Sequence, residues 1–213
     1  MGNKQAATKH ILYLVDKKKK DGILSLVTNY QEDVYEKFFD ELIKIPENEP
    51  INIIITTDGG SAHWCSKICY VLKNRSGTSK VFVKSSAHSA GAIIALTASE
   101  LYITYDTSLS AIDAQVSPLS DIFQTSLQNL SKFANDPVKT FSDLNKDRTI
   151  YFRNLTEKYL NDQHDKDLIM QTMHDSTSTH EQLFFKEDLD AMGIKYQIWD
   201  GDAKNIPGTP IEL

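Results

Sequence analysis

The chain has 213 residues and a formal net charge of −6, from 23 basic and 29 acidic side chains. The acidic excess argues against broad nucleic-acid binding, which requires a basic face. A chain of this length buries roughly 70% of its unfolded surface, so it can fold without disulfides or a metal.

Strand and helix patterns alternate through the first half of the chain. Apolar runs at residues 11–15 and 23–27 predict strands around a lysine-rich loop, and apolar positions at helical spacing predict a helix over 31–45. Further strands are predicted over 51–55, 81–85 and 101–105, with helices after Ser61 and over 89–99. Strands that are apolar on both faces are typical of a buried, largely parallel sheet. We therefore expect an α/β fold.

The pattern changes after Pro118. Residues 119–174 contain no glycine and no strand-like run, which predicts a region made of helices. A short helix that ends at Gly193 and a last strand follow. A single domain over residues 1–213 accounts for this pattern; its parts are a core over 11–118, a helical region over 119–174, and a C-terminal helix and strand over 178–199.

The two cysteines, Cys65 and Cys69, are spaced four positions apart on a predicted helix. This spacing is not a CxxC motif, and no quartet of His and Cys residues completes a zinc site. We expect ordinary thiols, no metal, no cofactor and a reducing, cytoplasmic compartment.

Ser89 lies in a small-residue turn between a β-branched run and an apolar helical run. A hydroxyl at the start of a helix lies close to free N–H groups and to the positive end of the helix dipole, which stabilise developing negative charge. A second strand end, Asp58-Gly59-Gly60, precedes it in the chain. Ser89 is therefore the predicted nucleophile, and the N–H groups of Gly59 or Gly60 and of Ala90 are the predicted oxyanion hole.

Four segments in order carry a resemblance to a known family: residues 55–60, 87–100, 111–115, and the pair 178–180 with 186–194. They resemble the serine dehydrogenase proteinase family, which is similar to signal peptide peptidase A within the ClpP/crotonase superfamily. The resemblance implies a ClpP/crotonase-like spiral of β-β-α units with a helical C-terminal part. It also implies a homo-oligomeric serine peptidase that acts on peptide or unfolded polypeptide. His88, Ala92 and Ala114 depart from the family pattern.

A serine hydroxyl needs a base to act as a nucleophile at neutral pH. The window 112–116, where ClpP-like enzymes carry a histidine, has none. The resemblance to signal peptide peptidase A implies a lysine instead, for which Lys132, Lys139 and Lys146 are candidates. We select Lys146, because it is expected to open a helix over 146–160, where the helix dipole disfavours a protonated amine.

His180 is the alternative base, because it lies in the Thr-His stretch of the resemblance. Its acidic partner would be Asp113 or the adjacent Glu181. The alternative to a catalytic role is a structural one, in which His180 anchors the C-terminal helix by hydrogen bonds.

Two other functions fit parts of the pattern. A catalytically inactive ClpP-like scaffold would explain the altered Asp113-Ala114-Gln115 stretch. A crotonase-type acyl-CoA enzyme would use the same two N–H donors to hold a thioester enolate, without a serine nucleophile.

No apolar stretch reaches 18 residues, so no transmembrane segment is expected. Membrane association stays open, because the N-terminus resembles a myristoylation signal except for Ala6.

Overall fold

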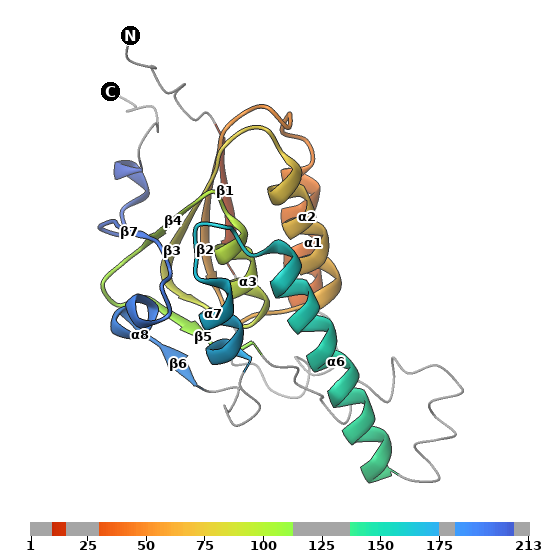
Figure 1. The fold of residues 1–213 in the computed structure, drawn as a ribbon. Helices are drawn as coiled ribbons and strands as arrows, with labels where there is room; N and C mark the ends of the chain where they lie inside the picture. Colours follow the sequence, from red (N-terminus) through yellow and green to blue (C-terminus); the bar gives the residue numbers. More distant parts are fainter. Residues whose placement is uncertain (1–9, 16–29, 113–136, 175–181, 207–213) are drawn as a thin grey trace.

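The structure, a computed structural model, describes residues 10–15, 30–112, 137–174 and 182–206 (Figure 1). The strand expected over 23–27 lies outside these residues. None of the helices in the described ranges is both long and apolar enough to cross a membrane.

A sheet of seven described strands forms the centre of the fold. Its main path runs in the order β1-β2-β3-β4-β7, and every pair along the path is parallel. The strands of this path are β1 His10–Val15, β2 Ile51–Thr57, β3 Ser79–Ala87, β4 Glu100–Ile103 and β7 Gln197–Ile198. The long isoleucine run of β2 suits a central strand that is buried on both faces.

Two short strands extend the sheet beyond this path. β5, Ser108–Ser110, pairs in parallel with the end of β3. β6, Leu183–Phe184, pairs antiparallel with β5 and places Leu183 opposite Ser110. The sequence did not predict either strand, because two or three residues are too few to establish a period of two.

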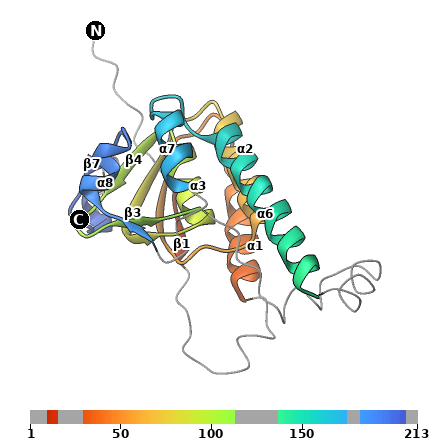
Figure 2. The same ribbon diagram turned by 60° about the horizontal axis from the view of Figure 1, so that its bottom comes forward.

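Helices cover one face of the sheet (Figures 1 and 2). α1 and α2 pack against each other, and α3 lies between α2 and β3. Every residue of α3 is buried, which explains why this helix is apolar on all sides. The bounds of these helices are α1 Tyr30–Leu42, α2 Ala62–Asn74 and α3 Ala90–Thr97.

The C-terminal half adds further helices. α6, Pro137–Tyr159, runs alongside α2 on the outer side of the helical layer, and α7, Lys166–Met173, packs against α6 (Figure 2). α8, Lys186–Ala191, follows β6, and a 3₁₀ turn, η2, spans Ala203–Asn205. α6 begins earlier than predicted: Pro137 opens the helix, a position where its missing N–H costs no hydrogen bond.

Apolar clusters fill both faces of the sheet. The larger cluster lies between the sheet and the helices. The smaller lies on the opposite face, where Phe82 stacks on Tyr102 at 4.4 Å and Trp199 packs edge-on against Phe82. Residues 199–206 thus cover the second face, and the expectation of a buried, mainly parallel α/β sheet is confirmed.

Candidate active site

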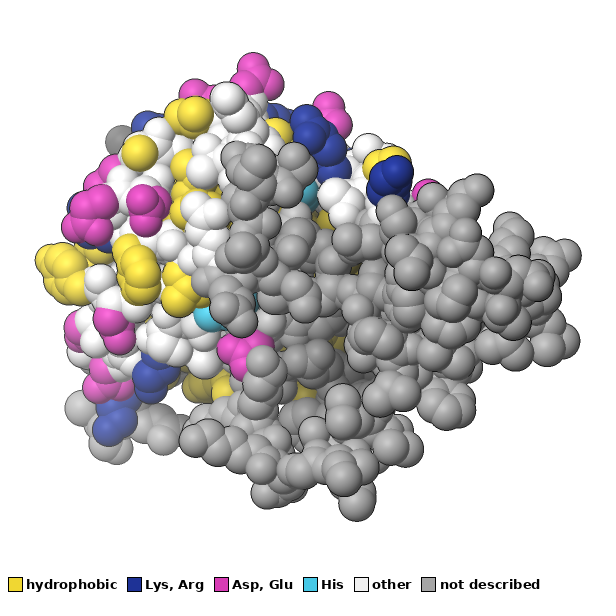
Figure 3. Space-filling model, turned by 90° about the horizontal axis from the view of Figure 1, so that it is seen from below, with side chains coloured by type: hydrophobic (Ala, Val, Ile, Leu, Met, Phe, Trp, Pro, Cys, Tyr) yellow, Lys and Arg dark blue, Asp and Glu magenta, His cyan; other side chains and the backbone are white. Residues whose placement is uncertain are grey.

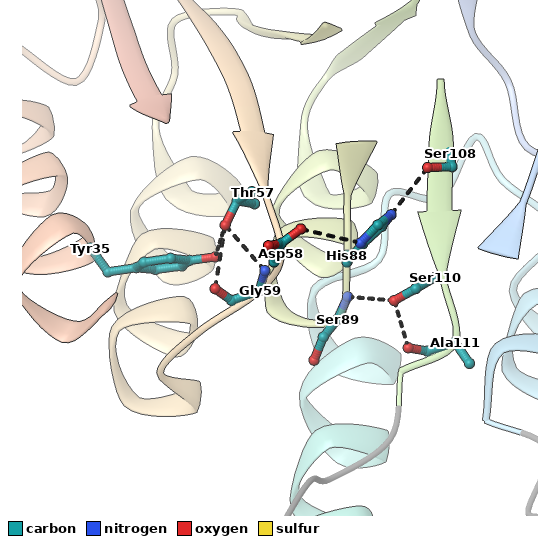
Figure 4. A network of polar contacts seen from close by, with 9 residues as sticks. All are labelled: Tyr35, Thr57, Asp58, Gly59, His88, Ser89, Ser108, Ser110 and Ala111. Carbon is teal, nitrogen blue, oxygen red and sulfur yellow. Dashed lines mark hydrogen bonds and ion pairs between the residues drawn. The ribbon is translucent and has the colours of Figure 1, made fainter. Parts of the chain in front are cut away.

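Ser89 lies between the end of β3 and the start of α3 (Figure 4). Its backbone has φ 47° and ψ −116°, and among the described residues it is the one non-glycine residue with a positive φ. Such a conformation costs roughly 1–3 kcal/mol and is concentrated at functional sites. A strained serine between a strand and a helix is the geometry that exposes a nucleophile in hydrolases with a nucleophile elbow.

Hydrogen bonds hold the peptide group between His88 and Ser89 at both ends. The carbonyl oxygen of His88 accepts the N–H of Gly91 at 2.8 Å. The N–H of Ser89 donates to Ser110 Oγ at 2.8 Å, and the Ser110 hydroxyl donates to the carbonyl of Ala111 at 2.9 Å. The backbone before Ser89 is therefore fixed by a side chain from β5.

The Gly-Gly turn after β2 lies directly against this serine. Gly59 has φ 105°, and a Cβ added to it would come within 2.9 Å of Ser89 Cβ. A Cβ on Gly60 would lie 2.8 Å from Cε2 of Tyr35. Both positions therefore require glycine, one because of its backbone and its close approach to Ser89, the other because of an aromatic ring.

Thr57 organises the same turn. Its hydroxyl oxygen accepts the N–H of Gly59 at 3.1 Å and contacts the hydroxyl of Tyr35 at 3.2 Å. The pairing of β2 with β3 shifts register between Ile55 and Thr57, so that Thr57 pairs with Ala87. Such irregularities are frequent next to active sites. The Gly59 N–H is thus already used within the turn.

The N–H groups of Gly60 and Ala90 differ from that of Gly59. The hydrogen bonds formed among the described residues include none donated by either group. Ala90 is the first residue of α3, where backbone N–H groups lack an intrahelical acceptor. Of the three predicted oxyanion donors, only Gly59 therefore donates its N–H to another described residue.

His88 lies next to Ser89 in the chain, but its imidazole points away from the serine hydroxyl (Figure 4). Its Nε2 lies 3.1 Å from Ser108 Oγ, and its Nδ1 lies 3.8 Å from a carboxylate oxygen of Asp58. These contacts connect the ends of β2 and β3 with β5. Adjacency in the sequence therefore does not turn the imidazole of His88 toward the Ser89 hydroxyl.

Only some of the candidate bases for Ser89 lie within the described residues. Lys146 is exposed and lies well inside α6, so the argument that it opens a helix is wrong. Lys139 is the third residue of α6, and the helix-start argument applies to it instead. Lys132, His180 and Asp113 lie outside the described residues.

Residues 8–200 match the family of ClpP-like SDH-type serine proteinases. The chain belongs to this family. The match covers the whole described sheet and both loops that meet at Ser89, in agreement with the resemblance inferred from the sequence.

The ClpP-like chain is also similar to two uncharacterized proteins of Methanocaldococcus jannaschii. One is 25% identical over 173 residues, which are 79% of this chain and 57% of that protein. The other is 24% identical over 154 residues, which are 70% of this chain and 54% of that protein. The chain therefore spans slightly more than half the length of these curated relatives.

Among solved structures, the ClpP-like chain is similar to a membrane-bound stomatin-specific protease, determined as a mutant in complex with a substrate peptide. The TM-score is 0.52 at 16% identity, and the alignment covers 97% of this chain and 85% of that one. The likeness shows a ClpP-like fold.

The two thiols of this ClpP-like chain lie beneath the turn that carries Ser89. Cys65 and Cys69 are fully buried and free, with their sulfurs 3.9 Å apart. The thiol of Cys65 donates to the carbonyl of Ala90 at 3.4 Å, and burial raises its pKa well above the usual value. Thiols that are fully buried are inaccessible to reagents, so these cysteines serve packing.

Sequence reasoning missed three residues that support the site: Tyr35, Thr57 and Ser110. Thr57 precedes Asp58-Gly59-Gly60, so its position next to the turn was a usable signal. No local pattern connects Tyr35 or Ser110 with Ser89, because each comes from an element distant in the chain.

Proposed function

We propose that the protein is a serine endopeptidase in which Ser89 attacks the carbonyl carbon of a peptide bond. The observation that carries this proposal is the strained backbone of Ser89 at the start of α3, against the Gly59-Gly60 turn. Strain of this kind is retained where the geometry is needed for function. Membership of a serine proteinase family supports the same reaction.

The oxyanion of the tetrahedral intermediate would be held by the N–H groups of Gly60 and Ala90. The Ala90 N–H belongs to the first turn of α3, so the helix dipole adds to its effect. Removal of one such donor typically costs about 3 kcal/mol of transition-state stabilisation.

We propose a lysine as the base, in a Ser-Lys dyad. Its neutral amine would take the proton of the Ser89 hydroxyl and pass it to the leaving amine of the cleaved peptide. The same amine would then deprotonate the water that hydrolyses the acyl-enzyme. Lys146 and Lys139 are the candidates on α6, Lys132 precedes that helix, and His180 with Asp113 remains the alternative.

The substrate class that we propose is an extended peptide or unfolded polypeptide, added as a strand beside the Gly59-Gly60 edge. The substrate peptide bound by the structural neighbour supports this class.

Two large apolar residues are exposed near this site: Leu183 is 40% exposed and Phe185 is 46% exposed. Leu183 lies opposite Ser110 in the β5–β6 pair. Figure 3 views the molecule from below and shows several hydrophobic side chains among charged ones on the described part of that face. Apolar peptide side chains would suit this surface, and a homo-oligomer would restrict access to it.

Labelling with a fluorophosphonate probe and hydrolysis of a quenched fluorescent peptide library test the proposal. The wild type should react with both, and Ser89→Ala with neither. Lys132→Ala, Lys139→Ala, Lys146→Ala and His180→Ala then identify the base, because only its loss should lower the labelling rate by about a hundredfold or more. Lys158→Ala is the matched control, because Lys158 is also an exposed lysine of α6.

A wild type that neither reacts with the probe nor cleaves any peptide would contradict the proposal and favour an inactive scaffold. Turnover of an acyl-CoA by both the wild type and Ser89→Ala would instead favour crotonase-type chemistry, because that reaction does not use a serine nucleophile.

A further inference from the structure

Three consecutive peptide groups around Ser89 are each held by hydrogen bonds. In the first, the N–H of His88 donates to the carbonyl of Thr57 at 3.0 Å. In the second, the His88 carbonyl accepts from Gly91 and the Ser89 N–H donates to Ser110. In the third, the Ser89 carbonyl accepts the N–H groups of the next helical turn, Ala92 at 3.0 Å and Ile93 at 3.3 Å.

Ser110 supplies the single side chain among these partners. The other contacts join backbone to backbone, and the N–H of Ala90 in the third peptide group stays available. Ser110 is only 1% exposed and Ser89 is 6% exposed, so water does not readily replace this bond. The hydroxyl of Ser110 is itself oriented, because its proton goes to the Ala111 carbonyl.

We propose that Ser110 is a positioning residue that holds Ser89 in its strained conformation and thereby aims both the nucleophile and the Ala90 N–H. This inference rests on the proposed function of Ser89. The φ angle of Ser89 turns its side chain relative to its own N–H, and the ψ angle turns the Ala90 N–H. With the Ser89 N–H anchored to Ser110, relaxation toward ordinary helical φ would break a buried hydrogen bond.

The anchor also connects the nucleophile to the C-terminal part of the chain. Ser110 belongs to β5, and β5 is held on its other side by β6. The N–H of Ala111 donates to the Gln182 carbonyl at 3.1 Å, and the N–H of Ile112 donates to the Met173 carbonyl at 2.8 Å. The position of the Ser110 hydroxyl therefore depends on these later segments.

Ser110→Ala and Ser110→Cys test the role, and Ser110→Thr tests rescue. Cysteine fills nearly the same space as serine but accepts hydrogen bonds weakly, so it removes the anchor without a cavity. We expect kcat and the fluorophosphonate labelling rate of both variants to fall at least about tenfold, with little change in KM. Ser110→Thr, which keeps the hydroxyl, should retain most of the rate.

Ser108→Ala is the matched control. Ser108 lies on the same strand, is 6% exposed and bonds through its hydroxyl to His88 rather than to Ser89. It should label at close to the wild-type rate. Labelling of Ser110→Cys at the wild-type rate, or an equal loss of rate in Ser108→Ala, would overturn the inference.

Hydrogen exchange of the Ser89 amide separates this inference from the proposed function. The amide should exchange slowly in the wild type and faster in Ser110→Ala and Ser110→Cys, whatever their activity. A wild type that the probe does not label would defeat the proposed function together with the catalytic consequence of the anchor. A labelled wild type with an unchanged Ser89 amide in both variants would defeat the anchor alone.

Discussion

Gly59 and Ser89 approach each other so closely that a Cβ on Gly59 would lie 2.9 Å from Ser89 Cβ and 3.1 Å from the His88 carbonyl oxygen. The contact joins the ends of two neighbouring parallel strands, β2 and β3. Since both residues also have positive φ angles, neither turn can relax without moving the other.

Gly59→Ala should lower both stability and reactivity. The added methyl group meets the Ser89 turn, and φ 105° is costly for alanine, so we expect a loss of roughly 1–3 kcal/mol in the free energy of unfolding. The folded fraction should also lose fluorophosphonate labelling, because Ser89 must shift. Urea unfolding and the labelling rate measure the two effects.

Gly201→Ala is the control for Gly59→Ala. Gly201 has φ 83°, but its Cβ would meet only Thr104 Cγ2, at 3.3 Å. It should lose stability through its backbone alone and keep its labelling rate. Equal labelling by the two variants would show that contact with Ser89 is unimportant.

Thr57→Val and Tyr35→Phe should show coupled losses of stability. Valine keeps the shape of Thr57 but leaves the Gly59 N–H without its acceptor, which costs about 1–3 kcal/mol, and Tyr35→Phe removes a second contact to the same oxygen. The double variant should lose less than the sum of the two single losses, because both changes affect one network. Urea unfolding of the four proteins gives the coupling energy, and strict additivity would refute a shared network.

His164 should make stability depend on pH. Burial, followed by the charge of Lys195, lowers the pKa of His164 from about 6.5 to about 4. Its Nδ1 accepts the Lys195 N–H at 3.0 Å, and protonation of Nδ1 would break that bond. Between the two pKa values the unfolded chain binds a proton that the folded chain does not, so stability falls as pH falls.

The measurement for His164 is urea unfolding of wild type and His164→Leu at several pH values. Between pH 7 and pH 5 the wild type should lose about 2 kcal/mol more than the variant, which cannot titrate at this position. Parallel pH profiles for the two proteins would contradict the assignment.

The buried thiols should be inert in the folded protein. Burial raises the pKa of Cys65, and both sulfurs are fully buried, so iodoacetamide at pH 8 should modify neither cysteine in native conditions and both in urea. Mass spectrometry of the protein treated in native conditions and in urea gives the number of modified thiols in each. Rapid alkylation of the native protein, or loss of peptidase activity on brief treatment, would point to a reactive cysteine instead.

The sequence was most informative where local pattern and function coincide. The β-branched run, the small-residue turn and the apolar helix predicted Ser89 at the start of α3, and alternation of apolar runs predicted the parallel sheet. The hydrogen bond from the Gly59 N–H to the Thr57 hydroxyl could not be predicted, because no sequence pattern connects the two groups.

The C-terminal part was harder to predict. Lys146 was expected to open a helix over 146–160, whereas the first residue of α6 is Pro137. Ser110 could not be connected with Ser89, because β5 is only three residues long and its partner β6 lies far along the chain. Tertiary contacts, rather than local periodicity, determine these features.

The pairing of β6 with β5 has a consequence for synthesis on the ribosome. The segment that carries Ser89 emerges long before residues 183–184, which flank the strand of Ser110. A growing polypeptide therefore carries the Ser89 hydroxyl well before the strand pair around Ser110 is complete. If Ser89 is the nucleophile we propose, such an order of assembly would keep it inactive while the unfolded backbone of the nascent chain is still exposed.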